Sequence, residues 1–227
     1  MEKINKFQFK VNKLYYYLFK ERFNKKINFN FPNDINRWDF IQKVIEIKKF
    51  NSYLEIGCDD NSSYSRINVK KKIGVDPVSG GNFKGTSDQF FNQNNDFFDC
   101  IFIDGLHEYD QVFRDIINAI KYLNKDGIII LHDCLPTSVH QQAVPRYKSG
   151  WTGDVWKAIV NFRTRAEYDT VTCKIDCGVS IIRKKKNQKL LNIQTKNFKE
   201  LKFIDFYNNY ENYMRVIDYN KIFEYLD

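Results

Sequence analysis

Residues 99–133 read DCIFIDGLHEYDQVFRDIINAIKYLNKDGIIILHD, and this stretch decides the fold class. It opens with a nearly all-apolar segment that ends at Asp104, which predicts a buried strand. Apolar residues then recur at helical spacing over 109–123. A second apolar segment, 128–131, follows an Asp-Gly turn and ends in a His-Asp pair. This order of strand, helix and strand predicts a parallel βαβ unit.

The same alternation extends toward both ends of the chain. Further buried strands are predicted at 52–57 and 72–76, and further helices at 37–49 and 154–165. Strands that are continuously apolar and alternate with helices are typical of a parallel sheet covered on both faces. We therefore expect an α/β fold with a doubly wound, mostly parallel sheet.

Two β-type runs close the regular part of the chain, at 170–175 and 178–183. They are joined by a tight turn around Asp176, which predicts an antiparallel hairpin. Because no further strand–helix unit follows, we expect this hairpin at the edge of the sheet.

Length and composition set the domain organisation. The chain has 227 residues, about one and a half average domains, and 43% of them are hydrophobic. We expect a helical arm over 1–36, a ligand-binding domain over 37–185 and a helical extension over 186–227. The basic, aromatic arm has three candidate roles: a helix docked on the body, a homodimer arm, or a surface-binding segment.

The net charge of +8 directs attention to anionic partners, such as nucleic acid or a nucleotide-linked molecule. Lysine outnumbers arginine 27 to 9, however, and arginine is preferred for specific phosphate recognition. The basic excess is therefore interpreted mainly as solvated surface, and nucleic acid is not the expected partner.

Three absences in the sequence bear on the compartment. No apolar run approaches the roughly 20 residues of a membrane span. No secretory signal pattern follows the first residue, and the five cysteines lack zinc-type spacing. We expect a cytoplasmic protein with reduced thiols and no transmembrane segment.

Polar side chains stand at every predicted strand end. In an open α/β sheet, ligands bind at the carboxyl ends of the strands. The residues found there are Glu55, Asp76, Ser87, Asp88, Asp104, His107, His132 and Asp133, together with Gly57 in the turn after the first strand. Because two of the three histidines are among them, the pattern predicts one functional site at this edge of the sheet.

The turn after the first strand distinguishes two cofactors. A dinucleotide needs glycines that let the backbone approach its pyrophosphate. This turn has Gly57 alone, followed by the adjacent carboxylates Asp59 and Asp60, which would repel a pyrophosphate. S-adenosylmethionine carries a sulfonium cation instead, and acidic surroundings favour a cation. Asp76, 19 residues after Gly57, is placed to bind ribose hydroxyls in either case.

Five segments together resemble a known family. They are Tyr53–Cys58, Gly74–Pro77, Gly85–Phe91, Phe102–Glu108 and Leu131–Cys134. In order and spacing they resemble the motifs of class I S-adenosylmethionine-dependent methyltransferases, most closely a bacterial subgroup that modifies glycans or natural products. The resemblance spans roughly residues 37–185 and implies a Rossmann-like, seven-stranded sheet with the last strand antiparallel.

The resemblance also implies roles for the strand-end residues. Glu55 and Gly57 would flank the methionine part of the donor, and Asp76 would hold the ribose. Ser87 and Asp88 would lie near the adenine, and Asp104 near the donor as well. The sequence departs from the family pattern in its first loop, where Gly57 stands without further glycines.

Catechol-type O-methyltransferases, which the chain also resembles, bind a divalent metal at positions matched by Asp104, His132 and Asp133. A set of two carboxylates and an imidazole suits Mn²⁺, Fe²⁺ or Zn²⁺ better than Mg²⁺. The alternative is that both aspartates only hydrogen-bond the donor and neighbouring loops.

His107 and His132 are the candidate bases for methyl transfer to a hydroxyl, because imidazole exchanges protons near neutral pH. The sequence lacks the Asn/Asp-Pro-Pro-Tyr type of motif found in enzymes that methylate base amines, which favours a hydroxyl acceptor. We expect a small-molecule or sugar acceptor. An anionic or nucleotide-linked acceptor would suit the loop 134–152, where Arg146 and Lys148 offer charge. Tyr147, Trp151 and Trp156 offer stacking.

Three other functions are compatible with the sequence. The charge suggests an RNA or other nucleic-acid methyltransferase, which a salt-dependent gel shift would support. The depleted glycine loop suggests a non-catalytic subunit that binds S-adenosylmethionine. Tight binding of NAD would instead indicate a dehydrogenase.

Overall fold

The structure, a computed structural model, describes residues 5–226. Eight strands form one sheet: β1 Ser52–Ile56, β2 Lys71–Asp76, β3 Phe83–Lys84, β4 Phe98–Ile103, β5 Leu123–Leu131, β6 Asp169–Cys173, β7 Val179–Arg183 and β8 Val216–Ile217. Eight α-helices accompany them in the described residues: α1 Lys6–Phe19, α2 Arg37–Lys48, α3 Ser87–Gln93, α4 Tyr109–Lys121, α5 Val139–Gln142, α6 Val155–Arg163, α7 Phe203–Met214 and α8 Tyr219–Leu226.

The strand order is β3-β2-β1-β4-β5-β7-β6-β8. β7 runs antiparallel to both of its neighbours, and every other pair is parallel. The mostly parallel sheet and the closing hairpin predicted from the sequence are confirmed, but the expected position of the hairpin at the edge of the sheet is wrong, because β8 lies outside β6. The expected count of seven strands is wrong, because β8 extends the sheet beyond β6 through the pair Thr172–Val216.

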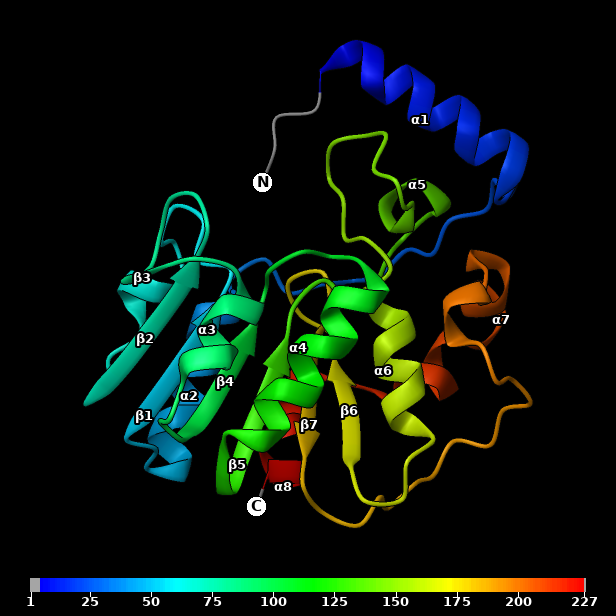
Figure 1. The fold of residues 1–227 in the computed structure, drawn as a ribbon. Coiled ribbons are helices and arrows are strands. Elements are labelled where there is room, and N and C mark those ends of the chain that lie inside the picture. The colour runs from blue at the N-terminus through cyan, green and yellow to red at the C-terminus, as the bar shows by residue number, and fades with distance from the viewer. Residues whose placement is uncertain (1–4, 227) are drawn as a thin grey trace.

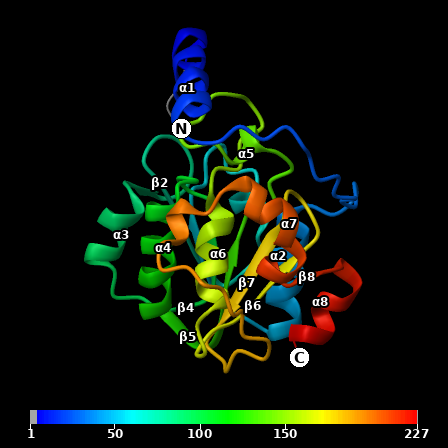
Figure 2. The ribbon, with the colours of Figure 1, turned by 90° about the vertical axis from the view of Figure 1, so that its right-hand side faces the viewer.

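Both faces of the sheet are covered, as predicted (Figures 1 and 2). Successive side chains of a strand point to opposite faces. In β4, Ile101 and Ile103 join the core under α4, α6 and α7, whereas Cys100 and Phe102 join the core under α2 and α8. Continuous apolar runs are therefore required here, since neither face of these strands meets water.

Element boundaries differ from the sequence predictions in several places. The helical arm predicted over 1–36 contains only α1 in the described residues, and residues 20–36, which lead from α1 to α2, form no regular secondary structure. No α-helix separates β1 from β2 in the described residues 57–70; a 3₁₀ turn at 64–66 stands there instead. β5 begins at Leu123, five residues earlier than expected, and reaches Phe98 of β4 through an irregular register. Residues 1–4 of the predicted arm lie outside the described residues.

The C-terminal segment is tied to the sheet by buried charges. Asp169 of β6, fully buried, lies 3.0 Å from Arg183 Nη2 and 2.7 Å from Arg215 Nη1. Arg215 directly precedes β8, so these ion pairs hold the chain after α7 against the sheet. None of the described helices combines the length and the hydrophobicity needed to span a bilayer.

Candidate functional site

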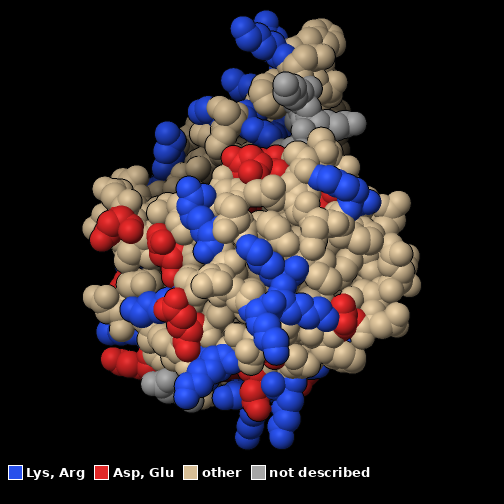
Figure 3. Space-filling view, turned by 90° about the vertical axis from the view of Figure 1, so that its left-hand side faces the viewer, with Lys and Arg blue, Asp and Glu red and all other residues tan. Residues whose placement is uncertain are grey.

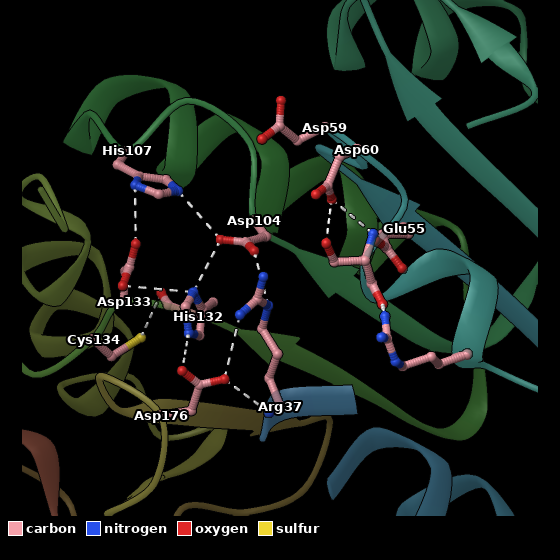
Figure 4. Close-up of polar contacts among 12 residues, drawn as sticks. Arg37, Glu55, Asp59, Asp60, Asp104, His107, His132, Asp133, Cys134 and Asp176 are labelled. Atoms are coloured by element: carbon pink, nitrogen blue, oxygen red, sulfur yellow. Dashed lines mark hydrogen bonds and ion pairs between the residues drawn. The ribbon is translucent and has the colours of Figure 1, made fainter. Parts of the chain in front are cut away.

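The carboxyl ends of β4 and β5 bring four of the predicted residues together. Asp104 follows β4, His132 and Asp133 follow β5, and His107 lies in the loop that leads to α4. All four side chains are largely buried and point toward one another (Figure 4). They converge because parallel neighbouring strands end at the same edge of the sheet.

His107 lies between two carboxylates. Its Nε2 is 3.2 Å from Asp104 Oδ1, within hydrogen-bond range. Its Nδ1 is 3.1 Å from Asp133 Oδ2, but this contact lacks hydrogen-bond geometry, and Nδ1 is a buried atom without a hydrogen-bond partner. His107 is therefore oriented by Asp104, and its second ring nitrogen faces Asp133 without a hydrogen bond.

His132 is held from both sides of its ring. Its Nδ1 lies 3.2 Å from Asp104 Oδ1 and 3.5 Å from Asp133 Oδ1. Its Nε2 lies 3.4 Å from Asp176 Oδ1 without hydrogen-bond geometry, so this nitrogen, like Nδ1 of His107, is a buried atom without a hydrogen-bond partner. Asp133 itself has a φ of 59°, a left-handed conformation that few residues other than glycine adopt readily, although aspartate tolerates it.

Arg37 and Asp176 complete the cluster, and neither was predicted from the sequence. Arg37, the first residue of α2, has its Nε 3.3 Å from Asp104 Oδ2 and its Nη1 3.3 Å from Asp176 Oδ2. From the sequence, Asp176 is expected only as part of the hairpin turn. Because β6 runs in the same direction as β5, a carboxylate just after β6 also belongs to the carboxyl edge, and that signal was present in the sequence.

The position of His107 depends on the loop before α6. The indole ring of Trp151 stacks on the imidazole at a centroid distance of 5.5 Å and an angle of 29°. Asp154 N donates to the backbone oxygen of His107 at 3.1 Å. Gly153 passes so close that a Cβ there would lie 1.7 Å from the same oxygen. The loop thus fixes both the ring and the backbone of His107.

The charges of the cluster balance when both histidines are protonated: three carboxylates, Asp104, Asp133 and Asp176, face Arg37 and two imidazolium groups. Burial lowers the pKa of both histidines, but the neighbouring carboxylates outweigh burial and raise each pKa above its usual value. Burial opposes the shift at Asp104 as well, yet the two histidines hold the pKa of that carboxyl well below its usual range.

The pKa values of the other two aspartates of the cluster shift in opposite directions. Burial raises the pKa of Asp133 despite the nearby histidines. For Asp176, burial is outweighed by His132 and Arg37, which lower the pKa to about 2. At the β4–β5 edge, the pKa of Asp104 is therefore lowered and that of Asp133 is raised. Neighbouring carboxyl groups with pKa values shifted apart are typical of acid–base sites.

Apart from Asp104, the predicted donor-side residues lie around this cluster rather than in it. Gly57, with a φ of +88°, packs against the Asp104 backbone, where a Cβ would lie 2.3 Å from the carbonyl oxygen. Only glycine fits this close approach without strain. Ser87 and Asp88 begin α3, and Gln111 of α4 donates to Ser87 Oγ at 3.1 Å and to Asp115 at 3.0 Å.

Asp76 is engaged by backbone groups from two loops. Its Oδ2 accepts from Asp59 N at 2.9 Å, and its Oδ1 accepts from Val78 N and Ser79 N at 2.8 and 2.9 Å. A carboxylate offers about four acceptor positions. Asp76 therefore organises the loops after β1 and β2 and has little capacity left for a ribose.

The segment that carries this site has a counterpart among known proteins. Residues 55–134 match a family model described as a methyltransferase domain. The fold is the Rossmann-like methyltransferase fold. A search of curated protein sequences finds no match.

Three solved structures illustrate the likeness in fold. An S-adenosylhomocysteine-bound methyltransferase from Podospora anserina is 15% identical, with a TM-score of 0.50 over 82% of this chain and 99% of that one. A protein from Staphylococcus aureus, named as a candidate caffeoyl-CoA O-methyltransferase, is 16% identical, with a TM-score of 0.50 over 78% and 91%. A candidate O-methyltransferase from Klebsiella pneumoniae is 13% identical, with a TM-score of 0.50 over 68% and 84%.

Glu55 lies apart from the histidine cluster of this methyltransferase fold. It is 1% exposed, and its Oε2 accepts a hydrogen bond of 2.6 Å from Tyr53 Oη. Burial, only partly opposed by this hydrogen bond, raises the pKa of Glu55 to about 8. The folded protein therefore holds Glu55 in its protonated form at neutral pH.

The raised pKa of Glu55 predicts a pH-dependent stability. The unfolded carboxyl ionises near its usual pKa of 4.5, whereas the folded one stays protonated up to about 8. The free energy of unfolding should therefore fall as pH rises between these values, by about 1.4 kcal/mol for each pH unit. Glu55→Gln should flatten this decline, measured by urea unfolding across the interval. Equal slopes in both proteins would contradict the raised pKa.

The loop 134–152 is largely packed rather than open. Trp156, which begins α6 with Val155, is buried and donates from Nε1 to Gln142 of α5 at 2.7 Å. Trp151 donates from Nε1 to the backbone oxygen of Ala143 at 2.6 Å. Trp156 therefore has no surface to offer an acceptor, whereas Trp151 reaches the site through its stacking on His107.

Surface charge does not form one continuous basic stripe on the side nearest β2 and β3. Lys and Arg side chains are interspersed there with Asp and Glu (Figure 3).

All five cysteines are free, four of them buried.

Proposed function

We propose that the protein is an S-adenosylmethionine-dependent methyltransferase that transfers a methyl group to a hydroxyl of a small molecule or sugar. The observation that carries this is the cluster of Asp104, His107, His132 and Asp133 at the carboxyl edge of the sheet. The methyltransferase-domain match over 55–134 and the fold support the donor. The bound S-adenosylhomocysteine of the Podospora protein supports it further.

His107 is the proposed base. S-adenosylmethionine would supply a methyl group already activated by its sulfonium, so the protein mainly needs to position the acceptor and remove its proton. Asp104 holds Nε2 of His107, and the unbonded Nδ1 accepts the hydroxyl proton. A sulfonium cation near this edge favours the neutral imidazole, which is the form that a base requires.

A divalent metal is the second candidate occupant of the cluster. Asp104, His107 and Asp133 each offer one donor atom, all within 4.8 Å of one another. The buried, unbonded Nδ1 of His107 also fits a ligand role. This set contains His107 where the sequence proposed His132. One ring nitrogen cannot bind a metal and accept a proton at once, so the two roles exclude each other.

We expect methyl transfer to persist in excess chelator, because the proposed base needs the Nδ1 of His107 free of a metal. Turnover should be compared before and after chelation, with metal analysis of the same samples. Loss of turnover that Mn²⁺ restores would assign His107 to the metal and remove it as base.

Asp76→Ala is expected to weaken donor binding by roughly ten- to hundredfold, since leaving buried polar groups unpaired costs about 1–3 kcal/mol. Because Asp76 binds three backbone N–H groups, the loss would come largely through the loops that it organises. Calorimetry with S-adenosylhomocysteine measures the affinity, and thermal unfolding shows that the variant is folded. An unchanged affinity would exclude Asp76 from the donor site.

The direct test of the proposed function uses methyl-labelled S-adenosylmethionine and a panel of hydroxylated acceptors, including sugars and nucleotide-linked sugars. RNA belongs in the same panel, because the net charge of +8 keeps a nucleic-acid acceptor as the alternative. Donor binding without transfer to any acceptor would favour a non-catalytic binding subunit. Absence of donor binding would reject the proposal.

A further inference from the structure

Helix α1 places its apolar side chains in solvent. Among the described residues, 13 large hydrophobic side chains are exposed, and seven of them lie on this one helix. The other six are distributed over the rest of the chain. Exposed apolar residues are ordinary when they are scattered, but a contiguous patch indicates a contact surface.

The exposed residues form a stripe along the helix. Phe7, Val11, Leu14 and Leu18 follow one another at intervals of four, three and four, which places them on one face. Their exposed fractions are 73%, 44%, 59% and 51%. The side buried against the body carries Asn12 and Tyr16 instead. The helix therefore presents its apolar face outward, the reverse of a helix that serves the core.

Basic residues accompany this stripe. Residues 6–26 carry seven exposed basic side chains: Lys6, Lys10, Lys13, Lys20, Arg22, Lys25 and Lys26. Their only acidic residue, Glu21, is half-buried and accepts from the backbone N–H groups of Phe203 and Ile204. The surface around the stripe is therefore strongly positive.

α1 is fixed on the body above the proposed site. Asn12 Nδ2 donates to the backbone oxygen of Arg146 at 2.7 Å, and Gln142 Nε2 donates to Tyr16 Oη at 3.1 Å. Figures 1 and 2 show α1 standing over α5, on the side toward which the parallel strands β1, β2, β4 and β5 point. The stripe and the carboxyl edge of the sheet thus belong to the same end of the molecule.

We propose that α1 docks the protein on an anionic lipid bilayer, with the apolar stripe in the interface and the basic side chains at the headgroups. An amphipathic helix with Phe and Leu on one face and Lys around it binds in this way. A second copy of the chain fits less well, because stacking two such helices would bring two rows of lysine together. Docking in this orientation turns the carboxyl edge of the sheet toward the membrane.

The docking does not rest on the proposed function, because lipid binding can be measured without any methyl acceptor. The probe is the full chain mixed with vesicles of phosphatidylcholine and phosphatidylglycerol, or of phosphatidylcholine alone, and separated by flotation. We expect binding to the anionic vesicles only, weakened by salt. The variant Phe7→Ser/Leu14→Ser/Leu18→Ser should lower the bound fraction at least about tenfold.

Two matched controls separate the stripe from general surface effects. Val78→Ser/Phe97→Ser removes exposed apolar side chains elsewhere and should bind as the unchanged protein does. Lys6→Gln/Lys10→Gln/Lys13→Gln should lose binding, whereas Lys70→Gln/Lys125→Gln/Lys186→Gln, with the same change in net charge, should keep it. Failure of the full chain to bind anionic vesicles would overturn the proposal. So would a dimer in sedimentation that the stripe variant dissociates.

Discussion

His107→Ala is expected to lower turnover by about 10²–10⁴-fold, the usual contribution of a general base. Donor affinity should fall far less than turnover, because Asp104 is the one predicted donor-side residue among the contacts of His107 with Asp104, Asp133 and Trp151. Turnover is measured with an acceptor found in the panel, and donor affinity by calorimetry. Near-normal turnover in this variant would defeat the assignment.

His132→Ala is the comparison that gives this result its meaning. Both ring nitrogens of His132 face carboxylates, and its Nε2 faces Asp176 rather than the side of His107. We expect this variant to lose stability as well as turnover, because Asp176 would be left with Arg37 alone and Asp104 would lose one of its two histidines. A loss of metal in either variant would show that the substituted histidine is a ligand.

Gly153→Ala is expected to reduce both stability and turnover. The residue has a φ of +61°, which costs an alanine more than about 1 kcal/mol, and the added Cβ would lie 1.7 Å from the backbone oxygen of His107. Relieving that overlap costs about 1–3 kcal/mol more. Because the strain falls on the backbone of His107, turnover should fall even where the protein remains folded. Urea unfolding and turnover are the two measurements.

Gly150→Ala provides a closely matched control. Gly150 has a φ of +64°, and a Cβ there would meet nothing within 4 Å. This variant carries the same backbone penalty without the overlap. We expect a small loss of stability and normal turnover. Equal effects of the two substitutions would mean that the approach of Gly153 to His107 does not position the base.

Much of the fold was predictable because it depends on local pattern. The apolar runs that became β1, β2, β4 and β5 are short, continuous and bounded by turns, which indicates strands buried on both faces. β8 was not predictable, because two residues are too few to show the alternation of apolar and polar residues that marks a strand. Its pairing with β6 also depends on the buried contacts of Asp169. The outward orientation of the apolar face of α1 was also not predictable. Periodicity shows that a helix has an apolar face, but not whether that face packs on the protein or points into solvent.

The sequence by itself determined four of the residues that stand at the carboxyl edge of the sheet, because strand ends can be read from the chain. Asp104, His107, His132 and Asp133 were found in this way. Only the tertiary structure decided how they pair, and it added Arg37 and Asp176 from segments 139 residues apart. Hydrogen bonds and ion pairs depend on distances of about 3 Å between side chains. Those distances are set by how the strands, α2 and the hairpin pack together, which no local pattern encodes.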